Sequence, residues 1–266
     1  MNRVESRTPR FVVLGAALGV LFLGLPILGL MKRVAWSSLW SQLTDAATLE
    51  ALRISLYASV CATAIALVLG LPLAWVLARM QLKTRRIIRA LILLPMVLPP
   101  VVGGVALLGA YGKSNGLLGG VLNDFFGIQL TYSLWGVVIA EAFVALPFLV
   151  LALEGGLRAI DTKYEESAAV MGAGDYSRFR LVVLPLLRPS LAAGLLLAWA
   201  RALGEFGATI TFAGNIQGRT QTTPLAVYSM LESNPEGAYA LSFLLVAVCV
   251  GVLIGLRDRW ISGGAQ

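Results

Sequence analysis

The sequence predicts an all-α, polytopic membrane protein with six transmembrane helices, and three observations lead to this fold class. First, 58% of the 266 residues are hydrophobic and only 13% are charged, with a mean hydropathy of +0.82. Soluble domains carry about 25% charged residues, so this chain lacks the polar surface that water requires. Second, the chain contains six long, nearly uncharged runs. Third, its Lys and Arg residues gather between alternate runs.

The six runs have the length that a membrane span requires. A hydrocarbon core about 30 Å thick needs about 20 residues of apolar helix. Four runs of this length carry no charge: 11–31, 54–78, 90–112 and 237–256. Two others, 132–153 and 189–213, carry isolated charges: Glu141 in the first, and Arg201 and Glu205 in the second. We therefore expect residues 1–266 to form a single transmembrane domain.

The first run follows Arg3, Arg7 and Arg10, which is also how a secretory signal peptide begins. It is longer than the apolar part of a signal peptide, and no small-residue cleavage site precedes Lys32. We therefore interpret this run as an uncleaved membrane anchor.

The third run, 90–112, contains Pro95, Pro99 and Pro100, followed by Gly103 and Gly104. Proline removes a backbone donor and clashes with the preceding turn, so this span is expected to be kinked. The kink has two interpretations that the sequence leaves open: it serves packing, or it lines a transport pathway.

The placement of Lys and Arg predicts the orientation of the chain. Fifteen of the 21 Lys and Arg residues fall on one side of the six spans, five fall on the other, and Arg201 lies inside a span. Cytoplasmic loops carry the excess of these residues, so both termini are expected in the cytoplasm. The formal charge of +7 is thereby explained without a nucleic-acid partner.

The longest cytoplasmic segment, 158–188, connects the fourth and fifth spans. Thr162 and Glu165 have the spacing of a capping box, and Gly172 or Gly174 is expected to end the helix that they begin. Asp175 is then expected to cap a second short helix. The loop therefore predicts two short helices outside the membrane.

This segment resembles the loop motif E-A-A-x3-G-x9-I-x-L-P of permease subunits of ATP-binding-cassette importers. Ser replaces the first Ala and Val replaces Ile, while the spacing is kept throughout. The matching residues are Glu166, Ser167, Ala168, Gly172, Val182, Leu184 and Pro185. The resemblance implies the fold of a type I importer permease.

In that family the loop is a coupling helix, which docks into a cleft of the ATPase subunit. The resemblance assigns this role to Glu165, Glu166, Ser167, Ala168, Ala169, Gly172, Leu184 and Pro185. The small residues Ala168, Ala169 and Gly172 suit entry into a groove, and Glu166 suits a basic partner surface. The alternative is an ordinary amphipathic helix that covers the end of the bundle.

The chain is not expected to be an enzyme by itself. It has no G-x-x-x-x-G-K-[ST] phosphate-binding loop, no His, and only Cys61 and Cys249, both within apolar runs. We therefore expect no metal or cofactor on this chain. The resemblance places ATP and Mg on a separate ATPase subunit, and only the assembled complex would hydrolyse ATP.

The stretches 91–112 and 200–228 resemble molybdate permeases, with sulfate and tungstate permeases as close relatives. This likeness implies import of a tetrahedral oxyanion, most of all molybdate, across a bacterial inner membrane. It also implies a homodimer of the permease, two copies of the ATPase and an extracytoplasmic oxyanion-binding protein. The docking surface for that protein is expected in the outer loops at Lys113, Asn115, Gly116 and Arg219.

Ionisable residues at membrane depth are costly, about 2.5–3.5 kcal/mol each on insertion scales. Arg201 and Glu205 are four residues apart and are expected to pair, and Glu141 is expected within reach of Arg201. Either these groups form a gate or subunit interface, or they are a structural ion pair. The full set of pathway or gate candidates is Glu141, Arg201, Glu205, Thr209, Thr211, Asn215, Pro99 and Pro100.

Two other classes of protein remain as rivals. An ion-coupled secondary transporter has similar hydropathy, but the sequence shows no inverted repeat, and an ion gradient does not account for the loop motif. A structural membrane scaffold is the second rival, and it predicts no oxyanion uptake.

Overall fold

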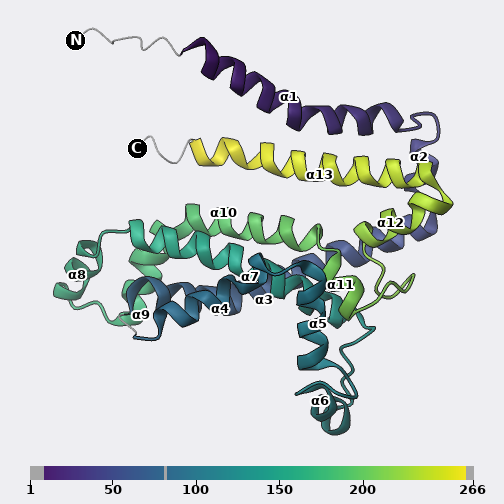
Figure 1. Ribbon diagram of the computed structural model, residues 1–266. Coiled ribbons are helices and arrows are strands. Elements are labelled where there is room, and N and C mark those ends of the chain that lie inside the picture. The colour runs from purple at the N-terminus through teal and green to yellow at the C-terminus, as the bar shows by residue number, and fades with distance from the viewer. Residues whose placement is uncertain (1–8, 81–82, 262–266) are drawn as a thin grey trace.

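The computed structural model describes residues 9–80 and 83–261, and this part of the chain consists of helices and connecting loops (Figure 1). The predicted cytoplasmic Arg3 and Arg7 lie outside the described residues. In chain order the elements are α1 (Arg10–Arg33), α2 (Leu39–Leu43), α3 (Ala46–Arg79), α4 (Arg85–Val97), α5 (Pro100–Tyr111), α6 (Gly119–Phe126), α7 (Leu134–Ala159), α8 (Lys163–Val170), α9 (Asp175–Arg178), the π-helix η1 (Phe179–Val183), α10 (Leu184–Leu203), α11 (Gly207–Phe212), α12 (Thr223–Ser233) and α13 (Pro235–Ile261).

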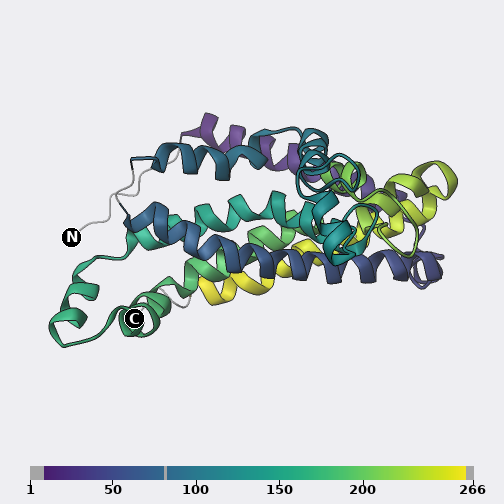
Figure 2. The same cartoon turned by 90° about the horizontal axis from the view of Figure 1, so that it is seen from below.

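The predicted number of spans is confirmed if a bent helix pair is counted as one. Among the described residues, five helices are long and apolar enough to cross a membrane, and α4 with α5 form a sixth, broken unit. The long helices run side by side, with α8 and α9 at one end of the bundle (Figures 1 and 2). This is the all-α, polytopic fold that the hydropathy predicted.

Helix α7 is the centre of the bundle, and α3 and α10 pack against it. The face of α3 toward α7 carries a small residue at every fourth position, and all of them are buried: Ala58, Ala62, Ala66, Gly70 and Ala74. Small side chains let two helix backbones approach closely, which is how helices associate where lipid surrounds them. The side chains of α7 fill this surface, and Leu146, Leu149 and Val150 lie against Gly70.

The third span is broken rather than kinked, which corrects the expectation. Helix α4 ends at Val97, α5 begins at Pro100, and the two helices are bent by 120°. Leu98 and Pro99 both precede a proline and are extended, since the ring of the next residue disfavours helical geometry. Pro95 lies inside α4 without ending it. The pair Pro99–Pro100 therefore causes the break.

The fifth span also differs from the expected run, 189–213. Helix α10 already begins at Leu184 and ends at Leu203, and the short helix α11 follows after a break at Gly204. The predicted single helix was wrong at this point because the run of apolar residues continues through the break. Hydropathy detects burial in lipid but not a change of backbone direction.

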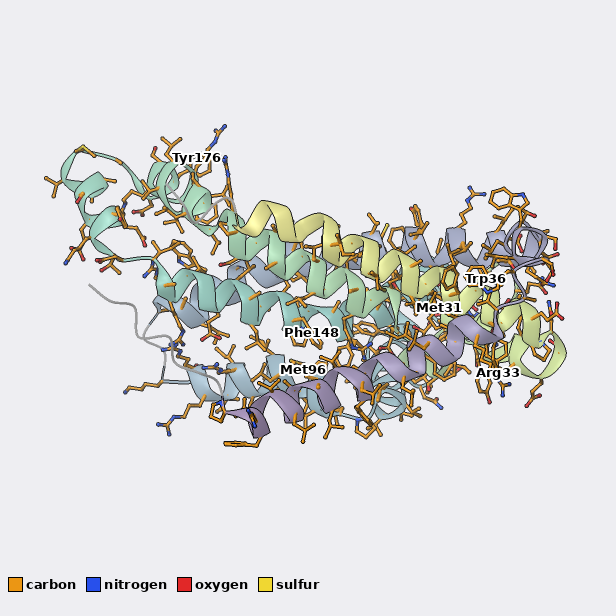
Figure 3. The ribbon with its side chains drawn as sticks, turned by 90° about the horizontal axis from the view of Figure 1, so that it is seen from above. Met31, Arg33, Trp36, Met96, Phe148 and Tyr176 are labelled. Carbon is orange, nitrogen blue, oxygen red and sulfur yellow. The ribbon has the colours of Figure 1, made fainter. Side chains whose placement is uncertain are left out.

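Helix α1 lies at the edge of the bundle, with no buried residue. Its last turn is tied to α13, where Arg33 donates a hydrogen bond to the Tyr239 hydroxyl at 3.1 Å and lies over its ring. Just beyond, Trp36 packs edge-on against Phe243. Arg33 and Trp36 lie at the end of the molecule opposite Tyr176 (Figure 3).

Candidate functional site

Two regions carry the predicted functional residues. The first is the loop of α8, α9 and η1, which projects from one end of the bundle (Figure 1). The second is the pair of helix breaks between α4 and α5 and between α10 and α11, within the bundle.

Helix α8 ends at Val170, and Gly172, one of the two glycines expected to end it, forms the turn that follows. The glycine has a φ of +87°, a left-handed conformation that residues with a Cβ adopt only at a cost. Its N–H donates to the Ala169 carbonyl at 2.9 Å, and the Ala173 N–H donates to the Ala168 carbonyl at 3.0 Å. These bonds satisfy carbonyls at the end of the helix, so the sharp turn requires glycine at position 172.

The exposed tip of α8 differs from the expected face. Ala168 is only 5% exposed and points into the protein, whereas Val170 and Met171 are 90% and 81% exposed. Glu166, Ser167 and Ala169 are also exposed. Ala168 is therefore covered in this conformation, and its role in docking stays a prediction. The exposed apolar residues directly before the glycine were not among the predicted residues.

The expected caps of these helices are also corrected. Thr162 occupies the N-cap position of α8 but makes no capping hydrogen bond, and Asp161 instead accepts from the Lys163 N–H at 3.0 Å. Gly174, rather than Asp175, occupies the N-cap of α9, and Asp175 pairs with Arg178. The spacing of residues along the chain did not predict which residues cap the two helices, because the folded chain offers these side chains other hydrogen-bond and ion-pair partners.

Glu165 does not cap α8; instead, it forms an ion pair with Arg79, at the end of α3. Their N···O distance is 2.6 Å, and both side chains are less than 20% exposed. Arg79 also donates a hydrogen bond of 3.5 Å to the Ile160 carbonyl, in the link between α7 and α8. The position of α8 is therefore tied directly to a membrane-spanning helix.

A second ionic cluster lies beside it, centred on Glu154 of α7, which is 3% exposed. This carboxylate accepts a hydrogen bond from Arg158 on the same helix. Arg85 and Arg89 of α4 each lie 3.6 Å from the same oxygen. One buried carboxylate thus joins α4 to α7. The sequence signal for it was present, since Glu154 lies at the end of an otherwise apolar run, but the cluster was missed.

The end of the motif, Leu184–Pro185, begins α10. Pro185 stands at the start of α10, which continues the π-helix η1 directly. The preceding π-helix carries Phe179, whose ring packs edge-on against Trp75 of α3 at a centroid distance of 5.5 Å. The motif thereby anchors the loop to α3 and to the fifth span.

The predicted pairing of Arg201 with Glu205 is confirmed, although Glu205 lies beyond the end of α10. The Arg201 Nη1 and Glu205 Oε2 atoms are 2.6 Å apart. The other oxygen of Glu205 accepts the Ala208 N–H at 2.9 Å, so this carboxylate also satisfies the start of α11. The ion pair therefore bridges the break in the fifth span.

The expected contact of Glu141 with Arg201 is not formed. Glu141 is 1% exposed, and neither of its oxygens has a hydrogen-bond partner among the described residues. It lies on α7, and among the described residues no ion pair joins it to Arg201, which pairs with Glu205 instead. The positions of Glu141 and Arg201 along their helices predicted a similar depth in the membrane, but they did not determine whether the two side chains meet.

The two helix breaks meet each other. A Cβ on Gly207, the first residue of α11, would lie 2.6 Å from the Pro100 ring, and one on Gly104 would lie 2.6 Å from Thr211. The start of α11 therefore packs directly on the start of α5. Pro99 and Pro100, which the sequence proposed as pathway residues, are exposed at this junction.

The three polar candidates near the junction occupy different environments. Thr209 is fully buried, and Thr211 is half-buried and donates to the Gly207 carbonyl at 2.8 Å. Asn215 is half-buried and donates to the Ser229 hydroxyl at 2.9 Å. In this conformation Thr209 contacts no open space, while Thr211 and Asn215 remain accessible in part.

The predicted docking residues of the outer loops lie at the surface. Lys113, Asn115 and Arg219 are exposed, and Lys113 donates to the Gln129 side chain at 3.4 Å. Gly116 is half-buried, and its N–H donates to the Gly112 carbonyl at 2.9 Å. Their role in docking stays a prediction.

These features together define a membrane component of a transport system: a bundle with two adjoining broken spans and a helical loop tied to them by ion pairs. The family described as "Binding-protein-dependent transport system inner membrane component" matches residues 66–262. The chain belongs to this family.

Among individual relatives, the chain is similar to molybdenum permeases. It is 45% identical over 251 residues to "Molybdenum transport system permease protein ModB" of Mycobacterium tuberculosis, a match that covers 94% of each chain. It is 39% identical over 169 residues to the protein of the same name of Escherichia coli, covering 64% of this chain and 73% of that one. It is 38% identical over 165 residues to "Sulfate transport system permease protein CysT" of Salmonella typhimurium, covering 62% and 59%.

A solved structure supports the fold independently. A chain of a bacterial ABC transporter involved in the import of the acidic polysaccharide alginate superposes with a TM-score of 0.71. The match covers 97% of this chain and 95% of that chain, at 17% sequence identity. The fold is therefore that of ATP-binding-cassette importer permeases.

Proposed function

We propose that this chain is the membrane-spanning permease subunit of an ATP-binding-cassette importer that carries molybdate into the cytoplasm. The observation that carries the proposal is the exposed tip of α8, Val170 and Met171, on a loop that ion pairs tie to the spans. An exposed apolar tip on a firmly anchored helix suits insertion into a groove of another protein. The 45% identity to a molybdenum permease along nearly its whole length supports the substrate.

The complete transporter then contains two copies of this chain, two ATPase subunits with ATP and Mg, and an extracytoplasmic oxyanion-binding protein. Both termini and α8 face the cytoplasm, and Lys113, Asn115, Gly116 and Arg219 face the binding protein. Closure of the ATPase subunits moves α8, and Arg79 and Glu154 pass this motion to α3, α7 and α4. The bundle then alternates between inward and outward openings.

Sulfate, thiosulfate and tungstate are alternative substrates, because tetrahedral dianions of this kind share shape and charge, and the similarity to a sulfate permease supports the first. An ion-coupled secondary transporter is the alternative of a different class. Uptake by proteoliposomes separates these cases: the proposal expects molybdate uptake that needs ATP and survives ionophores. Uptake driven by a proton or sodium gradient without ATP would contradict it.

The docking of α8 is tested by the double substitution Val170→Asp/Met171→Asp. Two carboxylates at the tip oppose burial in an apolar groove, so co-purification of the ATPase should fall at least about tenfold. Both residues are too exposed to affect folding. The matched control is Leu117→Asp, at an 85% exposed apolar residue between α5 and α6, which should leave co-purification unchanged. Equal recovery of the ATPase with both variants would refute the assignment.

A further inference from the structure

Arg201 is the one Lys or Arg within the six runs that the sequence predicts as spans. It lies in the last turn of α10, which ends partway along α13 (Figure 1). A charged group at this depth is unfavourable in lipid by about 2.5–3.5 kcal/mol, so its environment has to contain water or polar partners. The position of this arginine therefore needs an explanation.

The two members of the ion pair are unequally covered. The Arg201 side chain is 28% exposed, whereas the Glu205 side chain is 1% exposed. Glu205 is held inward by its bond to the Ala208 N–H, and among the described residues it is the one carboxylate within 4 Å of the Arg201 guanidinium. The arginine of this ion pair is therefore partly exposed, whereas the glutamate is buried.

The exposed part of a guanidinium at this depth faces an aqueous space more favourably than it faces hydrocarbon. The guanidinium has five N–H donors in a planar fork that matches the oxygens of an oxyanion, and Glu205 engages one terminal nitrogen. Donors thus remain for a passing anion.

We propose that Arg201 is a transit contact for the transported oxyanion and that Glu205 is the counter-ion that keeps this contact weak. A bare guanidinium at this depth would hold a dianion tightly and slow its release, whereas passage requires binding weak enough to leave. The buried carboxylate cancels much of the charge without meeting the anion. This inference rests on the proposed import of an oxyanion and names the residue that the ion contacts on its way.

The competing explanation is a purely structural ion pair, and a double substitution separates the two. Arg201→Gln alone leaves Glu205 buried without a partner, so its effects combine folding with transport. Arg201→Gln/Glu205→Gln removes both charges and nearly keeps the side-chain volumes, and the amide oxygen introduced at position 205 can still accept the Ala208 N–H. If the ion pair is purely structural, this variant should transport normally. If Arg201 contacts the passing anion, transport by this variant should fall.

The experiment uses the complete transporter of permease, ATPase and oxyanion-binding protein in proteoliposomes. We expect the double variant to retain ATP hydrolysis stimulated by the binding protein but to lose molybdate uptake by about tenfold to a hundredfold, the value of a charge-assisted contact. The control Arg188→Gln removes an exposed positive charge at the other end of α10 and should transport normally. Normal uptake by the double variant would overturn the proposal.

A second measurement does not depend on the double variant being stable. Glu205→Gln alone leaves the arginine uncompensated, so the detergent-purified complex of permease and ATPase should bind molybdate about tenfold more tightly at low salt than the wild type. Unchanged affinity, measured by calorimetry without the binding protein, would contradict the role of Glu205. Failure of the proposed function itself is distinguishable, because the wild-type transporter would then carry no oxyanion.

Discussion

At the scale of single residues, Glu154 has more ionic partners than any other carboxylate that the structure describes. One oxygen faces Arg85 and Arg89 of α4 and Arg158 of α7. Arg158 also donates to the Leu77 carbonyl of α3 at 3.5 Å. Three helices therefore converge on one buried carboxylate at the end of the bundle that carries α8.

Glu154→Gln should destabilise the protein by about 2 kcal/mol, because the arginines lose a buried counter-charge while remaining partly exposed to water. It should also reduce the coupling of ATP hydrolysis to transport, since α4 is released from α7. Thermal unfolding in detergent and the ratio of uptake to hydrolysis measure the two effects. Asp161→Asn is the control, because its ion pair with Lys163 is exposed and 3.9 Å long, and the asparagine oxygen can still accept the Lys163 N–H. Equal stability of both variants would argue against the cluster.

At the scale of elements, the two broken spans are packed together, because α5 and α11 are in close contact. Gly104 of α5 and Gly207 of α11 lie at the points of closest approach. The same junction joins the end of α4 to the ion pair of Arg201 and Glu205. The connection between α4 and the ion pair therefore runs through packed helices rather than through a flexible link.

Gly104→Val should separate α5 from α11, because its new Cβ would lie 2.6 Å from the Thr211 Cβ and 2.9 Å from the Ala208 carbonyl oxygen. Overpacking of this kind costs about 1–3 kcal/mol. Gly109→Val on the same helix meets nothing within 4 Å and is the matched control. Thermal unfolding and uptake measure the effect. Normal behaviour of Gly104→Val would mean that the two breaks move independently.

At the scale of the whole molecule, the bundle is asymmetric. Helix α7 is the most buried span, whereas α1 exposes apolar side chains along its length, including Phe11 at 77% and Phe22 at 78%. The loop with α8 lies at one end, and the ties of α1 to α13 lie at the other (Figures 1 and 3). The charge distribution predicts that the first of these ends is the cytoplasmic face and the second the outer face.

This orientation is testable with single cysteines in a Cys61→Ala/Cys249→Ala background. An impermeant thiol reagent should modify Asn115→Cys in intact cells and Val170→Cys only in inverted membrane vesicles, because the two exposed positions are expected on opposite sides of the membrane. Mass spectrometry of the purified chain measures the modification. The reverse pattern would place α8 outside the cell and would exclude an ATP-driven cytoplasmic partner.

The sequence by itself determined the fold class, the number of spans, a glycine turn after α8 and the pairing of Arg201 with Glu205. Each of these depends on hydropathy, on backbone geometry or on residues close along the chain, which short-range physics decides. Only the tertiary structure decided that Ala168 faces inward, that Glu165 leaves its cap for Arg79, that Glu154 binds α4, and that two broken spans meet at Gly207 and Pro100. These contacts join residues far apart in the sequence, and their partners are selected by helix packing rather than by local propensity.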